Sequence, residues 1–233
     1  MLNKEIIKEL GLLDYSHSLN MNLEHLKNED FTVLLLVITR WTDVEKRQAF
    51  RRMISRTNKN ELTFKYKLVF LFNVPLQEYI NNDSILTRES VFYKDFLVPN
   101  TEDNYKTVAL KLLSAFQLIH HNFAAHPLKW IVKLDDDVIL NLYNLDHYLS
   151  SNNVTQEQIH CKANYGSPMR QFDTKWYISK MEFNEVAYPP FCYGPIYIMT
   201  PQTGYLFYEL FAETFRELYI WIEDTYITGS YYC

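Results

Sequence analysis

Glycine is scarce in this chain: only 5 of its 233 residues are glycine. Collagen-like and glycine-rich disordered proteins need many more, so both classes are excluded. No apolar run approaches the roughly 18 residues of a membrane-spanning helix, and the longest, VLLLVI at 33–38, has the length of a strand. The N-terminal segment lacks the apolar core of a signal peptide, and its Ile6, Leu10 and Leu13 predict an amphipathic helix instead. Taken alone, the two ends indicate a cytosolic protein or a chain without its targeting segment.

Cysteine is also scarce, and the charge is slightly acidic. The three cysteines, Cys161, Cys192 and Cys233, are too few for a disulfide-rich scaffold and form no C-x-x-C metal motif, although one pair could form a disulfide. The formal charge of −5 argues against a large sequence-independent nucleic-acid surface, which needs excess lysine and arginine. We therefore expect no nucleic-acid partner.

Apolar runs and helical periodicity alternate along the chain. Buried strands are predicted at 31–38, 66–74, 93–100, 129–134 and 195–200. Helices are predicted over 42–56, where Thr42 and Glu45 fit a capping box, over 104–121, after Asn141, and from Pro201 to about 218, capped by Thr200. This alternation predicts an α/β fold with a mainly parallel central sheet flanked by helices, and ligands outside the carboxyl ends of its strands.

Three consecutive carboxylates, Asp135, Asp136 and Asp137, follow the predicted strand at 129–134. One interpretation is a solvated turn between a strand and a helix. The other is a divalent metal site, because a hard cation binds carboxylate oxygens and removes the repulsion among like charges. Alternation along an extended segment would place Asp135 and Asp137 on one face and Asp136 on the other. No EF-hand or phosphate-binding loop motif accompanies the cluster.

Several further segments accompany VKLDDDVIL in a fixed order: EKRQAFRR at 45–52, VFLFN at 69–73, ESVFYKDFLVPNTEDNYKTVALKLL at 89–113, KWYISKMEFNEVAYPPFCYGPIYIMT at 175–200 and EDTYITG at 223–229. Together they resemble the beta-1,3-galactosyltransferase-like family of glycosyltransferases, which includes beta-1,3-N-acetylglucosaminyltransferases. The resemblance covers roughly residues 31–230. It rests on the ordered set of segments rather than on any one of them.

The resemblance implies a GT-A type nucleotide-sugar fold and an inverting, Mn²⁺-dependent transfer of galactose or N-acetylglucosamine from a UDP-sugar to an acceptor glycan in beta-1,3 linkage. The family pattern places the metal on Asp137, with Asp135 as a second candidate ligand, and places Asp135 and Asp136 beside the nucleotide-sugar. It places the base that activates the acceptor on Asp224, with Glu223 as the alternative. The implied partners are a UDP-sugar and a glycan, glycoprotein or glycolipid acceptor.

Other candidate residues have two interpretations each. Arg47 and Arg51 lie one helical turn apart and could bind a diphosphate or uracil, or form a solvated basic face. Lys111 could support the donor pocket or extend its amine to solvent. Aromatic side chains can stack on sugar rings but more often belong to the core. Both interpretations are open for Trp176, Tyr177 and Tyr188. Gly194 belongs to the family's glycine-containing strand and completes the predicted substrate-binding set.

We expect a helical extension over 1–30 and a single glycosyltransferase-like domain over 31–233, truncated at its C-terminus relative to the family. The family location is the Golgi apparatus, and membrane association is expected only through an anchor that this chain lacks. A glycine of the family strand is replaced by Ile196. An inactive glycan- or nucleotide-binding relative therefore stays open as the alternative function.

Overall fold

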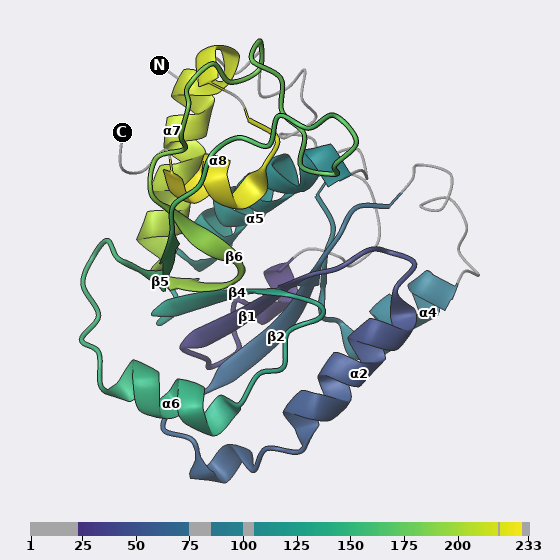
Figure 1. Cartoon of the computed structure of the whole chain (residues 1–233). Coiled ribbons are helices and arrows are strands. Elements are labelled where there is room, and N and C mark those ends of the chain that lie inside the picture. The colour runs from purple at the N-terminus through teal and green to yellow at the C-terminus, as the bar shows by residue number, and fades with distance from the viewer. Residues whose placement is uncertain (1–22, 75–84, 100–104, 219, 230–233) are drawn as a thin grey trace.

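A computed structural model describes residues 23–74, 85–99, 105–218 and 220–229. Its centre is a six-stranded sheet in the order β3-β2-β1-β4-β6-β5 (Figure 1). The amphipathic helix predicted around Leu10 and the third cysteine, Cys233, lie outside the described residues. Within the described ranges, no helix has both the length and the apolar character to cross a membrane.

The sheet is mainly parallel, as predicted. The parallel strands are β1 (Val33–Ile38), β2 (Tyr66–Leu71), β3 (Phe96–Leu97) and β4 (Trp130–Asp135). Two pairings are antiparallel: β6 (Phe191–Met199) pairs with β4, and β5 (Ile159–Asn164) pairs with β6. Strand β6 starts earlier than the predicted 195–200. The sequence of β5, IHCKAN, contains no apolar run, which explains why it was not predicted.

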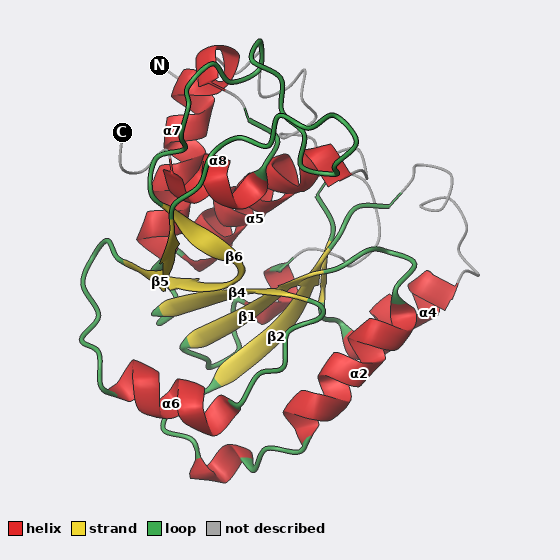
Figure 2. Ribbon diagram, in the orientation of Figure 1, coloured by secondary structure: helices red, strands yellow, loops and turns green. Residues whose placement is uncertain are grey.

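Helices cover both faces of the sheet (Figure 2). Helices α5 (Val108–Phe123), α7 (Pro201–Leu218) and α8 (Glu223–Gly229) share one apolar cluster with the sheet, and α2 (Val44–Ser55), α4 (Ile85–Tyr93) and α6 (Leu142–Ser150) share the other. Three short 3-10 turns complete the described elements, Glu24–Leu26, Lys59–Glu61 and Tyr105–Thr107. Leu23 and Leu26 are buried in the first cluster, so these two leucines belong to the core.

Two of the four predicted helix starts are confirmed, those after Asn141 and at Pro201, whereas the helix predicted from 104 begins as α5 at Val108. The Asn141 side chain accepts a hydrogen bond from the Asn144 N–H at 3.1 Å, and α7 begins at Pro201 after Thr200. The prediction of a capping box at Thr42 is wrong. Helix α2 begins one residue later, at Val44, with Asp43 at its N-cap. The Asp43 carboxylate accepts a hydrogen bond from the Arg40 side chain at 2.9 Å, so the chain before α2 is held by a charge pair instead.

A buried ion network joins α2 to α4. The Arg47 side chain is 0 % exposed, and its Nε and Nη2 donate to the two carboxylate oxygens of Glu89 at 3.0 and 2.7 Å. Arg51 donates to the same carboxylate at 2.6 Å and to both oxygens of Asp95 at 2.8 Å. Its guanidinium lies 3.8 Å from the ring centre of Tyr93. The helix therefore buries two cations because two carboxylates and aromatic faces surround them.

Arg47 also fixes the loop between β1 and α2. Its Nη1 donates to the Arg40 carbonyl at 2.7 Å and its Nη2 to the Trp41 carbonyl at 3.1 Å. Both carbonyls precede the helix. The conformation of this loop therefore depends on the ion network that holds Arg47.

A disulfide joins Cys161 of β5 to Cys192 of β6. It crosses the edge of the sheet and closes a loop of 31 residues. Closing such a loop stabilises a fold by about 3–4 kcal/mol in the chain-entropy account. The bond is also typical of proteins that fold in an oxidising compartment.

We expect Glu89→Gln to lower the free energy of unfolding by about 3 kcal/mol, because a buried pair loses one charge while the Arg47 cation stays desolvated. Urea denaturation followed by circular dichroism measures this. The matched control is Glu29→Gln, whose partner Lys67 lies at 2.7 Å in a pair that is 25 % and 44 % exposed. That change should cost less than about 1 kcal/mol. Equal costs for the two variants would contradict a stabilising role for the network.

Candidate active site

One cavity of about 730 Å³ lies at the carboxyl ends of β1 and β4. Its walls are the β1–α2 loop, the three aspartates, the middle of β6, the start of α8, the loop that carries Lys175 and Trp176, and two positions of α5. Its lining includes Thr39, Arg40, Asp43, Lys46, Lys111, Asp135, Asp136, Asp137, Lys175, Trp176, Tyr193, Gly194, Pro195, Trp221, Glu223 and Asp224. This is the edge of the sheet where the sequence predicts a ligand.

The three aspartates all line the cavity but have different surroundings. Only Asp135 is in the strand; Asp136 and Asp137 form a turn, so the predicted alternation of an extended segment is wrong. Asp136 accepts hydrogen bonds from the Thr39 hydroxyl at 2.8 Å and from Lys46 at 2.7 Å. Asp137 is exposed. The cluster therefore divides into one carboxylate bound to the β1–α2 side, one exposed carboxylate, and Asp135.

Lys133 connects Asp135 to the far wall. Its side chain is 1 % exposed, and its Nζ donates to Asp135 Oδ1 at 2.8 Å, to the Gly194 carbonyl at 2.6 Å and to Glu223 Oε2 at 3.4 Å. Burial pushes the pKa of Lys133 down, but the charges of Glu223 and Asp135 outweigh it, so the pKa is raised and the amine stays charged. One buried cation thus joins β4, β6 and α8.

Glu223 and Asp224 are adjacent but differently bound. Glu223 Oε1 accepts a hydrogen bond from the Tyr197 hydroxyl at 2.6 Å, so with Lys133 on Oε2 both of its oxygens are engaged. Asp224 accepts from the backbone N–H groups of Thr225, at 2.8 Å, and Gly194. Burial raises the pKa of both carboxyl groups. Burial also raises the pKa of Asp135, and the charges of Glu223 and Asp137 add to this.

Strand β6 is irregular where it faces the cavity. Its pairing with β5 shifts register between Cys161 and Ala163. Gly194 lies in this interval. Its carbonyl accepts a hydrogen bond from Lys133, and its N–H donates one to the Asp224 carboxylate. A Cβ at Gly194 would lie 3.0 Å from Asp224 Oδ2, so a larger residue here would push on the Asp224 carboxylate. Pro195, which has no N–H, stands at the same irregularity, where a proline is tolerated in a sheet.

The structure places the sequence-predicted residues in two groups. Asp135, Asp136, Asp137, Lys111, Trp176, Gly194, Glu223 and Asp224 line the cavity. Arg47, Arg51, Tyr177 and Tyr188 do not. For Arg47 and Arg51 this is a correction: they are neither phosphate ligands nor a solvated face, because Glu89 and Asp95 bind them. Lys111 is 3 % exposed, so its amine does not extend to bulk solvent. Acceptor contacts of Tyr177 and Tyr188 stay a prediction.

Sequence reasoning missed Lys133, Tyr197, Thr39 and Lys46. A signal existed for Lys133 alone, because a lysine within the apolar run WIVKL of a buried strand must find an acceptor. The partners of Tyr197, Thr39 and Lys46 lie 26, 97 and 90 residues away in sequence. Local patterns do not show such pairs.

The donor set fits a hard divalent cation that shares its shell with a diphosphate. In the described part of the chain, no group of three or more His, Cys, Asp or Glu side chains is arranged to hold a metal alone. The exposed Asp137 and the 40 % exposed Asp135 supply carboxylate oxygens on one cavity wall. Mg²⁺-like ions are usually held by one or two carboxylates plus substrate phosphates, which matches this pair.

Fold and site together are of the GT-A type: a mainly parallel, helix-covered sheet with an aspartate turn at the carboxyl end of a central strand. The chain belongs to the galactosyltransferase family, since the family model for galactosyltransferase matches residues 45–232.

Named relatives agree with the family. Mouse beta-1,3-galactosyltransferase 1 is 28 % identical over 203 residues, which cover 86 % of this chain and 60 % of the relative. The lactosylceramide 1,3-N-acetyl-beta-D-glucosaminyltransferases A of Danio rerio and B of Xenopus laevis are 26 % and 27 % identical, covering 83 % and 90 % of this chain. The chain spans only 52 % and 56 % of those two proteins.

We expect Lys133→Met to lower the free energy of unfolding by about 3–5 kcal/mol, because the largely buried carboxylate of Glu223 loses its cation and the partly exposed Asp135 loses its partner. The pKa of Glu223 should then rise further. Since a protonated carboxyl tolerates burial and an ionised one does not, the deficit should grow as the pH rises through that pKa. Urea denaturation across pH 5–8 measures this, with the exposed Lys129→Met as the control. A deficit that is independent of pH would contradict the electrostatic explanation.

Proposed function

We propose that this domain is an inverting hexosyltransferase that moves galactose or N-acetylglucosamine from a UDP-sugar to an acceptor glycan in beta-1,3 linkage. The observation that carries the proposal is the meeting of two carboxylate groups from separate elements in one cavity: Asp135–Asp137 after β4, and Glu223–Asp224 at the start of α8. The cavity volume of about 730 Å³ lies in the range of cofactor-sized ligands.

The aspartate turn is the proposed donor side. Asp137, with Asp135, would hold Mn²⁺ against the diphosphate, and the metal would neutralise the charge that develops on the leaving UDP. Asp136 acts differently, because Thr39 and Lys46 already bind it. Its role is to tie the β4 turn to the β1–α2 loop, so that both walls of the donor side keep one shape.

Asp224 is the proposed base, and Glu223 its support. Both Glu223 oxygens are engaged by Lys133 and Tyr197, whereas Asp224 lines the cavity with its Oδ2 close to Gly194. As the acceptor oxygen forms its bond to the sugar C1, its proton passes to the Asp224 carboxylate. The bond between C1 and the phosphate oxygen breaks, and UDP leaves with that electron pair. Attack opposite to the leaving group inverts the configuration at C1.

The acceptor and location follow from the family and are proposals too. Trp176 is 46 % exposed at the cavity and offers an aromatic face to a sugar ring. The relatives' names specify beta-1,3-galactosyl and 1,3-N-acetylglucosaminyl transfer. The Cys161–Cys192 disulfide supports an oxidising compartment, in agreement with protein glycosylation in the Golgi apparatus.

A panel of UDP-sugars with Mn²⁺ tests the function. We expect calorimetry to show Mn²⁺-dependent UDP binding by the wild type and UDP release in the presence of a glycan acceptor. Asp137→Ala should weaken binding at least about tenfold through the loss of one carboxylate ligand. The exposed Asp173→Ala serves as the control. Binding without turnover on any acceptor would support the inactive relative, and no UDP binding at all would overturn both functions.

Asp224→Asn should lower kcat by about 10²- to 10⁴-fold while UDP binding is retained, because only the proton acceptor is lost. Since burial raises the pKa of Asp224 above its ordinary value, the wild-type rate should fall with decreasing pH at a higher pH than for a solvated aspartate. Initial rates across pH 4–8 measure this limb. An Asp224→Asn variant as active as the wild type would assign the base elsewhere.

A further inference from the structure

Helix α8 is packed unusually closely against β6. The helix has seven residues, with Asp224 in its first turn and Gly229 at its end. A Cβ at Gly229 would lie 3.1 Å from Pro189 Cγ, and one at Gly194 would lie 3.0 Å from Asp224 Oδ2. Gly194 thus lets β6 approach the start of the helix, and Gly229 lets the end of the helix approach Pro189, just before β6. Such a short helix has little stability of its own, so its position depends on these tertiary contacts.

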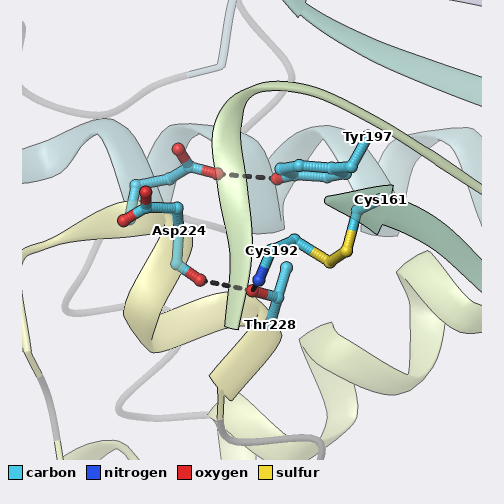
Figure 3. The surroundings of a disulfide bond; sticks show 6 residues. Cys161, Cys192, Tyr197, Asp224 and Thr228 are labelled. Atoms are coloured by element: carbon cyan, nitrogen blue, oxygen red, sulfur yellow. Dashed lines mark hydrogen bonds between the residues drawn. A yellow bond between two sulfur atoms is a disulfide. The ribbon is translucent and has the colours of Figure 1, made fainter. Parts of the chain in front are cut away.

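Between these two contacts, one hydroxyl joins the helix to the strand. Thr228 is 1 % exposed, and its Oγ1 lies 2.8 Å from the Cys192 nitrogen and 2.5 Å from the Asp224 carbonyl oxygen (Figure 3). The backbone N–H of Cys192 can only donate, so the hydroxyl accepts there. Its single proton is then directed to the Asp224 carbonyl. Both hydrogen bonds therefore have a fixed direction.

The strand end of this connection is itself held firmly. Cys192 is 1 % exposed, its neighbour in β5 is Ala163, and its sulfur is bonded to Cys161 (Figure 3). The helix end carries the backbone of Asp224. A displacement of Thr228 would move that backbone relative to Gly194. The N–H of Gly194 donates a hydrogen bond to the Asp224 carboxylate.

We propose that Thr228 is a positioning residue for Asp224: through its hydroxyl, the disulfide-anchored strand β6 sets where the Asp224 carboxylate lies in the cavity. The effect on rate rests on the proposed role of Asp224 as the base. Thr228 does not line the cavity and does not act on the substrate. It acts on the position of a group that does, and misplacement of such a group by about 1 Å can cost about 10²-fold in rate.

A purely structural role would predict a loss of stability without a specific loss of rate. Thr203 offers a matched control for this. It is 0 % exposed, and its hydroxyl likewise accepts from a backbone N–H, of Gln158 at 2.8 Å, and donates to a backbone carbonyl, of Gln158 at 3.1 Å. It lies beside Thr200 at the start of α7 and does not line the cavity.

The experiment compares Thr228→Val, Thr228→Ser and Thr203→Val below their melting temperatures. We expect Thr228→Val to lower kcat by about 10- to 100-fold with the donor KM little changed. Thr228→Ser restores the hydroxyl and should restore kcat. Thr203→Val should lose a similar amount of thermal stability and keep its kcat. Equal losses of kcat in Thr228→Val and Thr203→Val, or a wild-type kcat in Thr228→Val, would overturn the proposal.

Amide hydrogen exchange provides a second readout that needs no acceptor. In Thr228→Val the N–H groups of Gly194 and Thr225, both donors to Asp224, should exchange faster, whereas in Thr203→Val they should not. Unchanged protection in Thr228→Val would overturn the positioning role. Failure of the proposed function shows differently: Asp224→Asn would then match the wild type, whatever the exchange pattern of Thr228→Val.

Discussion

The buried ammonium of Lys133 is the interaction on which the site depends. It lies in the central strand β4 and is bound by three acceptors, one from its own strand, one from β6 and one from α8. A desolvated cation without these acceptors would cost several kcal/mol, and so would the largely buried carboxylate of Glu223 without the cation. Each wall therefore stabilises the others. The Lys133 amine stabilises the ionised carboxylates at the cavity. Without this cation, the carboxylates would tend to take up protons or the walls would tend to separate.

A second buried cation system shapes the opposite side of the cavity. Arg47 and Arg51 carry two charges into the interface of α2 with α4, and Glu89 and Asp95 balance them. Arg47 then binds the carbonyls of Arg40 and Trp41, in the loop whose neighbours Thr39 and Lys46 bind Asp136. Two buried networks thus meet at the aspartate turn, one through Asp135 and one through Asp136. Asp137 is the member of the turn that is left exposed to the cavity.

The sequence predicts the sheet well because β1 is a continuous apolar run and β2 and β4 are apolar except for Lys67, Lys133 and the final Asp135, which is typical of strands covered on both faces. It predicts the aspartates as a site because they follow such a strand. It does not predict the fate of Arg47, since the partner Glu89 lies 42 residues away and a lone helix pattern places an arginine at the surface. The same limit applies to β5, whose sequence has no apolar run, and to α8, which is held by contacts with β6 rather than by its own propensity.

The isoleucine that replaces a family glycine bears on whether the site works. Ile196 packs with the apolar cluster shared by α2, α4 and α6, and it does not line the cavity. The residues of β6 that do are Tyr193, Gly194 and Pro195. Of these, Gly194 is the one whose missing Cβ leaves room for the Asp224 carboxylate, since a Cβ there would lie 3.0 Å from Asp224 Oδ2. The substitution therefore adds bulk to the core side of the strand, and the close approach of strand and carboxylate is preserved. Ile196 is therefore no argument against the proposed transferase.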